Sequence, residues 1–356
     1  MNKPIDKAVD IRQGEELNQQ KLQTYLSSNL PNFSDAIEIK QFPGGFSNLT
    51  YLISTPKQEF VLRKPPLGAN IKSAHDMSRE FKVLSLLAPV YSKIPKPILF
   101  CEDEKIVGAP FYIMERVKGI ILRNKVPKGL DLTPNHFKKL STQIIENLVD
   151  LHNLELEKSN LISLGKPEGY VQRQVDGWSK RYLKAETDEI SSMNLAMEWM
   201  QSNMPSKTTT SFIHNDYKYD NLVLDADSLE IKAVLDWEMS TVGDPLMDLG
   251  TCLSYWIEKG ESSGLEQFNI TWAEGNLTRQ EFIEKYATLR NVAIDDILFY
   301  YVFGCFKLGV IMQQIYARYK KGVTKDKRFA ILIHLVKACG QNVENAIKYN
   351  RINNFY

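Results

Sequence analysis

The chain has 356 residues, and its 44 Lys and Arg against 43 Asp and Glu give a formal net charge of +1 at pH 7. This length predicts about two domains or lobes. Hydrophobic residues make up 43% and charged residues 24% of the chain, as in an ordinary globular protein. The balanced charge excludes a globally basic protein that binds nucleic acid or an anionic membrane, so any phosphate site must be local.

The cysteines and the first residues of the chain bear on its location. Four cysteines lie far apart and form no C-x-x-C pair, which argues against a zinc site and favours reduced thiols in the cytosol. Residues 1–22 are polar and charged and lack the apolar segment of a signal peptide. We therefore expect a cytoplasmic protein whose partner is a small molecule, with no nucleic-acid or membrane partner. The cysteines are Cys101, Cys252, Cys305 and Cys339.

The first third of the chain predicts a helix followed by an antiparallel sheet. Leucines at helical spacing favour a helix over residues 15–30, which ends at Pro31. Short runs rich in β-branched and aromatic residues, separated by turn residues, predict a five-stranded sheet. The five strands are expected at residues 37–40, 49–54, 60–63, 97–101 and 110–117.

A polar, glycine-rich turn lies between the first two of these strands and contains Gly44, Gly45, Ser47 and Asn48. Glycines let the backbone approach a polyphosphate, and small polar residues supply further hydrogen-bond donors. A two-glycine hairpin turn with no ligand is an equally common structure. This segment alone leaves both interpretations open.

The third strand and the helix after it carry a possible ion pair. Alternation along the strand puts Arg63 and Lys64 on opposite faces of the sheet. Glu80 falls inside the apolar stripe of a helix predicted over residues 76–88. A carboxylate on a buried face is costly without a partner, so we expect it to pair with Arg63 or Lys64. The alternative is that Glu80 lies at the edge of the stripe and reaches water.

Beyond Gly119 the chain becomes mainly helical. The most apolar run, residues 297–312, is interrupted by Lys307 and is shorter than the ~20 residues of a membrane span, so it predicts a core helix. His136 and His152 have no carboxylate or cysteine at metal spacing, and we interpret them as capping or packing residues. Apolar periodicity predicts helices over residues 133–154, 170–183, 244–257, 279–289, 295–321 and 329–349.

Residues 214–249 gather acidic and amide groups around two short apolar runs. The runs, residues 222–224 and 231–235, are separated by a polar turn near Ser228 and predict an antiparallel hairpin. This pairing puts Asn221 beside Asp236 at one rim of the hairpin.

Asp216 precedes Asn221 by five residues and can reach the same rim. Mg²⁺ prefers one or two carboxylates together with substrate phosphate oxygens, and this rim offers that minimum. An Asp, an Asn five residues on and a second Asp in the next strand provide a base and two metal ligands, which is the set that phosphoryl transfer uses.

The same segment resembles the aminoglycoside phosphotransferase and choline kinase branch of the protein-kinase-like superfamily. It is most similar to the phosphotransferase domains fused to some acyl-CoA dehydrogenases and to their free-standing bacterial relatives. The residues that carry the resemblance are His214-Asn215-Asp216 with Asn221, then Val234-Leu235-Asp236-Trp237-Glu238 and Gly243-Asp244-Pro245-Leu246-Met247-Asp248-Leu249.

The resemblance implies an α+β, two-lobed protein-kinase-like fold that binds ATP and Mg²⁺ in its cleft. Residues 1–117 would form the nucleotide-binding lobe, and residues 118–356 the helical lobe that carries the catalytic residues and the acceptor site. The nucleotide would be held by the loop with Gly44, Gly45, Ser47 and Asn48, by Arg63 with Glu80, and by the hinge near Glu115 and Val117.

In this family pattern Arg63 stands where kinases place a lysine, and Lys64 is the rival candidate. Arginine can bridge phosphate oxygens in a bidentate way, so the role survives the change.

The resemblance also assigns roles within the hairpin. Asp216 would accept or orient the proton of the acceptor hydroxyl, while Asn221 and Asp236 would hold Mg²⁺. Lys218 could neutralise the transferring phosphoryl group. His214 would brace the loop. Asp248 would accept hydrogen bonds from the catalytic loop, and the alternative is that it only stabilises a helix dipole.

The implied activity is that of an ATP-dependent small-molecule kinase. A protein kinase is disfavoured because no Ala-Pro-Glu segment follows Asp236 and the gap before Asp244 is short. A nucleotide-binding pseudokinase scaffold and a kinase of aminoglycosides or other amino alcohols are the alternatives.

A polycationic aminoglycoside would call for a cluster of carboxylates in the acceptor region. The region around Trp178 is instead rich in cations, which favours a neutral or anionic acceptor such as a hydroxyacyl compound or its thioester. The alternative is that the cations decorate a solvated helix face. The cations are Arg173, Lys180, Arg181 and Lys184, and the expected aromatic walls are Tyr170, Tyr182, Tyr255 and Trp256.

Overall fold

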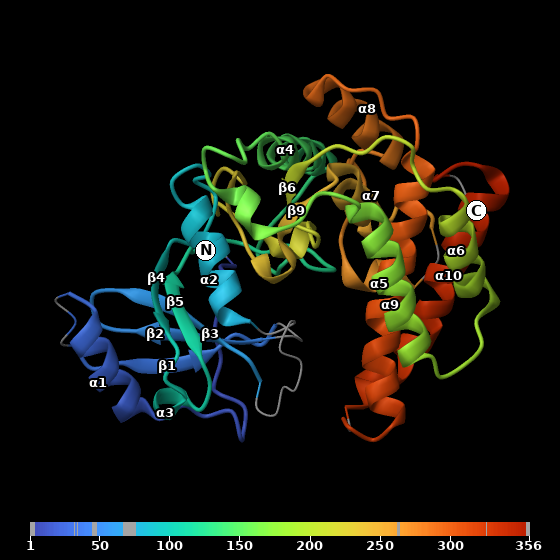
Figure 1. Ribbon diagram of the computed structural model, residues 1–356. Coiled ribbons are helices and arrows are strands. Elements are labelled where there is room, and N and C mark those ends of the chain that lie inside the picture. The colour runs from blue at the N-terminus through green and yellow to red at the C-terminus, as the bar shows by residue number, and fades with distance from the viewer. Residues whose placement is uncertain are drawn as a thin grey trace.

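The computed structural model describes residues 4–31, 33, 35–44, 48–66, 76–261, 264–324 and 326–353. These residues form a lobe built on a sheet and a larger helical lobe, as predicted (Figure 1). The end of the chain lies on the side of the helical lobe away from the sheet (Figure 1).

The sheet has five antiparallel strands in the order β1-β2-β3-β5-β4, which confirms the predicted number. Its central strand, β3, pairs with β2 on one side and β5 on the other. The strands are β1 (Glu38–Gln41), β2 (Leu49–Ser54), β3 (Glu59–Lys64), β4 (Pro97–Cys101) and β5 (Phe111–Glu115).

The two faces of this sheet differ. On the outer face, α1 (Gln19–Asn29) and the short α3 (Glu104–Val107) enclose a separate apolar core (Figure 1). On the other face, α2 (Met77–Leu87) packs on β4 and β5, and its apolar residues join the core of the helical lobe. The inner face is therefore the one that meets the catalytic segment, residues 214–249, through the contact of α2 with residues 237–239. The first helix begins at Gln19, later than the predicted residue 15, and α3 was not predicted.

The segment before α1 lies across the connection between the lobes. The Asp6 N–H donates to the Gly119 carbonyl at 3.0 Å, at the start of the helical lobe. Val9 and Gln41 exchange backbone hydrogen bonds at the edge of the sheet. Residues 4–10 thus tie the sheet lobe to the chain that leaves it.

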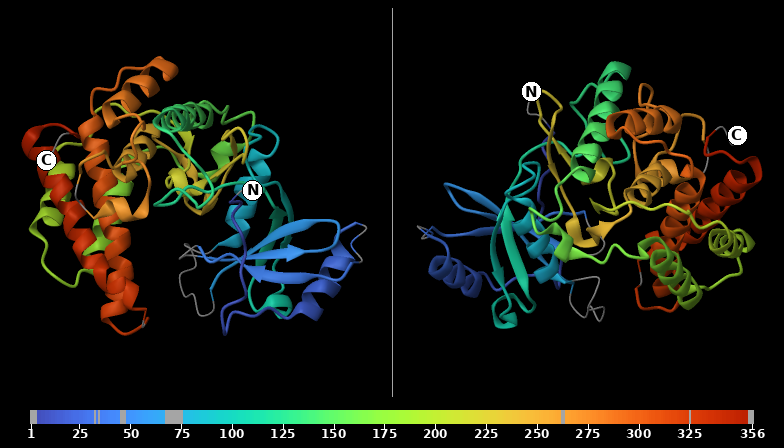
Figure 2. Two further views of the ribbon diagram at one scale, coloured as in Figure 1. Left: turned by 180° about the vertical axis from the view of Figure 1, so that it is seen from behind. Right: turned by 45° about the horizontal axis from the view of Figure 1, so that its top comes forward.

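Among the residues described, seven helices build most of the second lobe. Of these, α5, α6, α9 and α10 lie side by side, away from the sheet (Figure 2). The core helix α9 is long and apolar enough to cross a membrane. However, 78% of its most apolar 18-residue stretch is buried inside the protein, as predicted for a core helix. The helices are α4 (Pro134–His152), α5 (Tyr170–Ala185), α6 (Ser191–Ser202), α7 (Pro245–Tyr255), α8 (Arg279–Arg290), α9 (Ile297–Lys320) and α10 (Leu332–Tyr349).

Several short elements of this lobe were not predicted. They include α6, the pair β6 (Ser211–Ile213) and β9 (Thr241–Gly243), and single 3-10 turns. The helix predicted from residue 329 is a 3-10 turn until α10 begins at Leu332. The 3-10 turns are η1 (Leu161–Leu164), η2 (Tyr219–Asn221), η3 (Trp237–Met239), η4 (Leu265–Phe268) and η5 (Lys327–Ile331).

Helices α7 and α9 approach each other closely at two glycines. A Cβ added at Gly250 would lie 2.1 Å from the Tyr300 carbonyl oxygen, and one at Gly304 would lie 2.3 Å from the Gly250 oxygen. Only glycine permits such an approach of two helix backbones. Because α7 also carries Asp248 in its first turn, this contact sets the position of the residue expected under the catalytic loop.

We expect Gly304→Ala to separate α7 from α9, because the methyl group meets backbone that cannot move by itself. Overpacking of this kind costs about 1–3 kcal/mol of the free energy of unfolding. Denaturant unfolding would measure the loss of stability, and the activity assay would measure the displacement of Asp248.

The matched control is Gly177→Ala in α5, where the added Cβ meets only the tip of an arginine at 3.5 Å. There we expect a gain of about 0.5–1 kcal/mol from helix propensity. Equal stability of the two variants would contradict this account.

Candidate active site

The catalytic segment contains the predicted hairpin. Strands β7 (Leu222–Leu224) and β8 (Ile231–Val234) pair antiparallel, with Leu222 opposite Val234. Directly beyond the pair, the Leu235 N–H donates to the Asn221 carbonyl at 2.8 Å. Asn221 therefore stands beside the exit of β8, where Asp236 adopts a left-handed conformation with φ 67°.

Three donors surround the Asp216 carboxylate. The Tyr255 hydroxyl donates to Oδ1 at 2.9 Å, and the Asn221 amide donates to Oδ2 at 3.0 Å. The Lys218 ammonium lies 3.1 Å from Oδ2. The side chain keeps 16% of its surface exposed, so it is fixed in direction yet open to the solvent side. Tyr255, which was predicted as an aromatic wall of the acceptor site, thus donates a hydrogen bond to this carboxylate.

Lys218 is a charged group held within this cluster. Burial alone would lower its pKa, but the carboxylates of Asp216 and Asp220 raise the pKa well above its ordinary value. Its ammonium also lies 4.8 Å from the centre of the Tyr255 ring. Lys218 therefore stays charged beside Asp216. That it neutralises a transferring phosphoryl group remains a prediction.

Arg63 makes the predicted buried ion pair. Its Nη1 lies 2.5 Å from Glu80 Oε1, and Glu80 is 1% exposed, so the alternative in which it reaches water is wrong. Nη2 lies 3.0 Å from Asp236 Oδ1. Lys64 points to the opposite face and donates to the Val107 carbonyl at 2.7 Å. Of the two rivals, Arg63 is the one that faces the site.

Glu238 is a site residue that the sequence analysis did not assign. It follows Asp236 by two residues, through η3, and its carboxylate lies 3.9 Å from Arg63 Nη2. Burial and the nearby Asp236 raise the pKa of Glu238 to about 8. The Asn48 amide donates to it at 2.7 Å. The acidic pair two residues apart was the only signal for it in the sequence.

The rest of the predicted nucleotide loop is described only in part. Gly45 and Ser47 lie outside the described residues. At Gly44 an added Cβ would lie 3.7 Å from a guanidinium nitrogen of Arg123. The side chain of Asn48 points to the carboxylate of Glu238 across the junction of the lobes.

The donor chemistry of this rim fits a divalent cation. The carboxyl groups of Glu80, Asp236 and Glu238 lie around the Arg63 guanidinium. Burial opposes ionisation of Asp236, but Arg63 holds the pKa of that carboxyl below its usual value. Asn221 commits its NH₂ group to Asp216, so its carbonyl oxygen is the atom left for a ligand role. Carboxylate and amide oxygens are the ligands that Mg²⁺ accepts.

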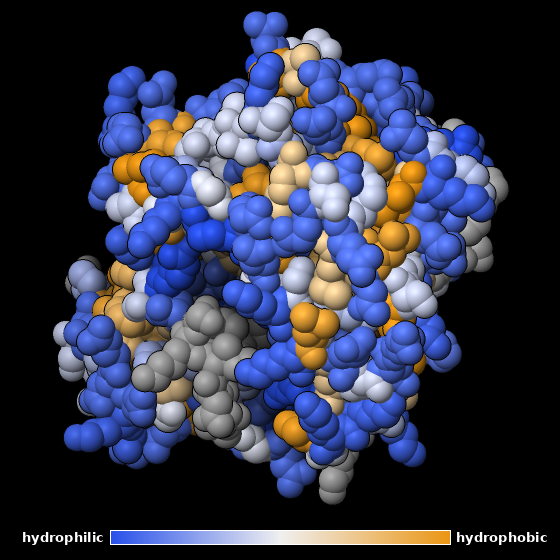
Figure 3. Space-filling view, turned by 45° about the vertical axis from the view of Figure 1, so that its right-hand side comes forward, coloured by the Kyte–Doolittle hydropathy of each residue, from blue (hydrophilic) through white to orange (hydrophobic). Residues whose placement is uncertain are grey.

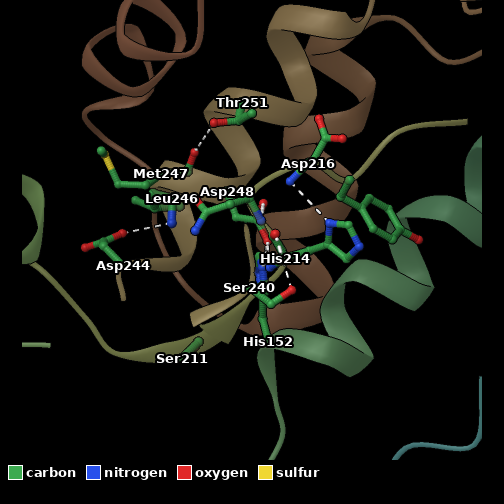
Figure 4. Close-up of polar contacts among 12 residues, drawn as sticks. His152, Ser211, His214, Asp216, Ser240, Asp244, Leu246, Met247, Asp248 and Thr251 are labelled. Carbon is green, nitrogen blue, oxygen red and sulfur yellow. Dashed lines mark hydrogen bonds and ion pairs between the residues drawn. The ribbon is translucent and has the colours of Figure 1, made fainter. Parts of the chain in front are cut away.

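A buried carboxylate holds the start of the catalytic loop. Asp248 is 0% exposed and accepts the N–H groups of His214 at 2.7 Å and Asn215 at 2.8 Å (Figure 4). Its Oδ2 also lies 3.1 Å from the buried Nε2 of His152. The predicted hydrogen bonds from loop to Asp248 are confirmed, and His152 is a packing residue as expected. His136 forms a capping box with Thr133 at the start of α4.

His214 braces the loop, as predicted. The Asp216 N–H donates to Nδ1 at 3.2 Å, so the ring proton is on Nε2, which donates to the Leu235 carbonyl at 2.9 Å. The imidazole is 0% exposed, and its bonds run to backbone on both sides of the hairpin. It therefore fixes Asp216 relative to Asp236 without contacting solvent.

The predicted hinge lies where the sheet lobe ends. β5 ends at Glu115, whose N–H donates to the Lys96 carbonyl at 2.9 Å. Val117 follows and packs on the small apolar cluster that holds part of β7 and β8. The chain then meets β7, where the Ile120 N–H donates to the Leu224 carbonyl at 2.8 Å. Adenine contacts at Glu115 and Val117 remain a prediction.

The face between the lobes is hollowed and has hydrophilic walls in the space-filling view (Figure 3). Next to the catalytic loop, a cavity of about 270 Å³ lies between α5, β9 and α9. Its walls are formed by Lys166, Tyr170, Arg173, Gln174, Trp178, Arg181, Asn215, Met239, Thr241 and Lys307.

Some of the residues predicted for the acceptor site line this cavity, and the others do not. Arg173, Arg181 and Tyr170 line it, and so does Trp178. Lys180 and Lys184 lie on the exposed face of α5. The expectation that Tyr182 and Trp256 form walls is wrong, because neither ring lines the cavity and both pack inside the core. Helical periodicity could not separate a ring that faces a cavity from one that faces a neighbouring helix. Lys307 was missed as a site residue, since it was interpreted only as an interruption in an apolar run.

Residues 38–283 match the model of the phosphotransferase enzyme family, which is more than half of the chain. The chain belongs to this family. It is 34% identical over 313 residues to mouse acyl-CoA dehydrogenase family member 10, covering 86% of this chain but 29% of that relative.

Solved structures agree with this assignment. A putative aminoglycoside phosphotransferase from Ralstonia eutropha is 27% identical and superposes with a TM-score of 0.76, covering 92% of this chain and 99% of that one. A choline kinase from Cryptosporidium parvum, at 15% identity, shares the fold with a TM-score of 0.59 over 92% of this chain and 100% of its own. The family match makes the chain a phosphotransferase, and these solved structures share its fold.

We expect Arg63→Met and Glu80→Gln to be strongly coupled in this phosphotransferase. Breaking a buried ion pair costs about 3–5 kcal/mol, because it leaves an uncompensated charge, so the double variant should lose far less than the sum of the singles. Denaturant unfolding of the four proteins gives the coupling energy, and activity should fall equally in all three variants. The control cycle uses the exposed pair Lys158 and Glu155, for which we expect no measurable coupling. Additive losses at the buried pair would contradict the assignment.

We expect the phosphotransferase to lose stability as the pH falls below about 6.5, in part through His152. Burial lowers the pKa of this imidazole, with Asp248 opposing that effect. A histidine whose pKa is lower in the folded state takes up its proton first in the unfolded state, which favours unfolding by at most about 1.4 kcal/mol per pH unit. In His152→Phe the free energy of unfolding should be lower overall but should fall less steeply with acid. An unchanged slope would show that His152 does not titrate on unfolding.

Proposed function

We propose that this small-molecule phosphotransferase moves the γ-phosphoryl group of ATP to a hydroxyl of a hydroxyacyl compound or its thioester. The observation that carries the phosphoryl-transfer chemistry is the joint fixing of Asp216 and Asp236. Asp216 is oriented by three donors, while Asp236 is placed beside Asn221 and paired with Arg63. These are the parts that phosphoryl transfer needs, which are a positioned base, metal ligands and fixed positive charge.

The roles of the individual side chains follow from these contacts. Asp216 accepts the proton of the acceptor hydroxyl, and Tyr255 keeps the carboxylate in the direction of that hydroxyl. Lys218 offers a permanent positive charge next to Asp216, where negative charge develops on the transferring group. Asn221 and Asp236 would hold Mg²⁺, which when bound neutralises phosphate oxygens. Arg63 is the cation that meets the nucleotide phosphates from the sheet lobe.

The nature of the acceptor rests on the cavity beside the catalytic loop. Cations line its walls, which disfavours a polycationic aminoglycoside. The similarity to a protein named for acyl-CoA dehydrogenase activity supports an acyl compound. We place the activity in the cytosol, in line with four free, buried cysteines.

We expect Asp216→Asn and Asp236→Asn to fail in different ways. Loss of the base should lower turnover by roughly 10²- to 10⁴-fold with little change in Mg-ATP affinity. Loss of a metal ligand should weaken Mg-ATP binding as well. Turnover is measured as ADP release with hydroxyacyl compounds, their thioesters, simple alcohols and amino sugars, and affinity by calorimetry.

The control for both variants is Asp150→Asn, on the exposed surface of α4. An Asp216→Asn variant within a few-fold of the parent would remove Asp216 from the base role. Equal Mg-ATP affinity of parent and Asp236→Asn would remove Asp236 from the metal site. Turnover of amino sugars alone would overturn the acceptor class.

A further inference from the structure

Lys307 is a buried cation in the middle of the core helix α9. It is 2% exposed, and its ammonium donates to the Asn215 carbonyl at 2.6 Å. The ammonium also lies 5.7 Å from the centre of the Trp178 ring. A lysine is almost never fully buried unless it is paired, because taking its charge out of water is costly.

The surroundings of Lys307 leave part of this charge without a direct partner. Within the part of the chain that the structure describes, the ammonium forms no ion pair, and the Asn215 carbonyl is the one hydrogen-bond acceptor for its three N–H donors. Burial lowers the pKa of Lys307 to about 8, with Asp216 and Asp248 opposing that effect and Lys218 and Arg181 adding to it. The site thus has room for an anion that the protein does not supply.

The charged side chains that line the cavity of Lys307 all have the same sign. Its charged walls are all cationic, namely Lys166, Arg173, Arg181 and Lys307, and its apolar walls include Trp178 and Met239. Arg181 lies 4.6 Å from the centre of the Trp178 ring, so two cations flank one indole. A volume of about 270 Å³ suits a molecule smaller than the drug-sized ligands of most pockets.

One wall residue of the cavity immediately precedes the proposed base in sequence. Asn215, whose carbonyl binds Lys307, is the residue before Asp216. Its amide donates to the Tyr170 hydroxyl at 3.1 Å and to the Met239 carbonyl at 3.1 Å, so the same residue fixes two other walls of the cavity. A molecule that places an anionic group at Lys307 thus lies against the residue that precedes Asp216 in the loop.

We propose that this cavity is the acceptor site and that Lys307, with Arg181 at the rim, selects acceptors that carry an anionic group in addition to the hydroxyl. This inference rests on the proposed function and names the charge that the acceptor must have. Lys307 is then a specificity-determining residue, since it binds the acceptor and takes no part in moving the phosphoryl group.

Two sources can supply this negative charge. One is the carboxylate of a free hydroxy acid, which fits inside the cavity and meets Lys307. The other is the phosphate groups of a coenzyme A thioester, which would lie at the rim, where Lys166 and Arg181 are exposed. Both are anionic oxygen groups that lysine and arginine bind, and the acceptors tested must separate them.

The test compares acceptors built on one carbon skeleton. These are hydroxycarboxylic acids with the hydroxyl on carbon 3, 4 or 5, their amides, their amino-alcohol analogues, and their thioesters with coenzyme A and with N-acetylcysteamine. In the parent, kcat/KM for an anionic acceptor should exceed that for the matching amide by about 10- to 100-fold, the scale of a hydrogen bond to a charged group. Calorimetry or thermal shift with the same compounds, without ATP, gives a readout of binding that does not depend on turnover.

Three variants complete the design. Lys307→Met keeps the length of the side chain and should erase the preference for the anionic acceptor, through KM more than kcat. Arg181 is exposed, so Arg181→Gln tests the site if Lys307→Met does not fold. In this variant kcat/KM should fall less for a free acid than for a coenzyme A thioester. Lys180→Met, on the exposed face of α5 and outside the cavity, should keep the preference of the parent.

The outcomes separate this inference from the proposed function. Equal kcat/KM for acid and amide, or a preference that survives in Lys307→Met, overturns the role of Lys307 while leaving the kinase activity in place. Binding of the anionic compound that is lost in Lys307→Met, with no turnover of any acceptor, supports the site and overturns the proposed function. Neither binding of an anionic compound nor turnover of any hydroxyacyl compound in the panel overturns both.

Discussion

The Arg63 guanidinium holds the catalytic residues of one lobe against the other. It projects from β3, pairs with Glu80 of α2 within the sheet lobe, and reaches Asp236 at the end of the hairpin. A buried ion pair contributes little net stability, because desolvation offsets the Coulomb attraction, but losing one partner is costly. Its effect here is therefore on alignment, because the Arg63 guanidinium contacts both Glu80 of the helix and Asp236 of the hairpin.

The catalytic loop depends on a second fixed point below this one. Asp248 binds the first two N–H groups of the loop, and α7 holds Asp248 in place through its glycine contact with α9. His214 then connects the loop to the hairpin through hydrogen bonds at both ring nitrogens. The loop has little regular structure of its own, yet it is held at both ends by buried polar contacts. Such preorganisation is what electrostatic catalysis requires.

What the sequence could predict follows from how local each signal is. The hairpin was predictable because a spacing of a few residues fixes it. Alternation along one strand put Arg63 and Lys64 on opposite faces, but only the family resemblance favoured Arg63 as the partner of Glu80. The contacts of Asp248 with the loop also came from the resemblance. The pair β6 and β9 was not predictable, because three-residue strands some thirty positions apart carry no periodic signal. Tyr182 and Trp256 were misplaced for a related reason, since periodicity identifies the buried face of a helix and not what that face meets.

Lys307 shows the limit of sequence patterns most directly. A single lysine in an apolar helix is compatible with a side chain that reaches solvent, and only the packing of α5, α9 and the catalytic loop shows that it does not. The desolvation cost of burying this ammonium must be offset by groups that interact with its charge. The described residues offset it only in part, through the Asn215 carbonyl and the Trp178 ring. A hydrophobic residue would fill the same position without that cost. The lysine is therefore best explained by an anion that enters the cavity from outside. Because Lys307 contacts Asn215, the residue before Asp216, we infer that this anion is part of the acceptor.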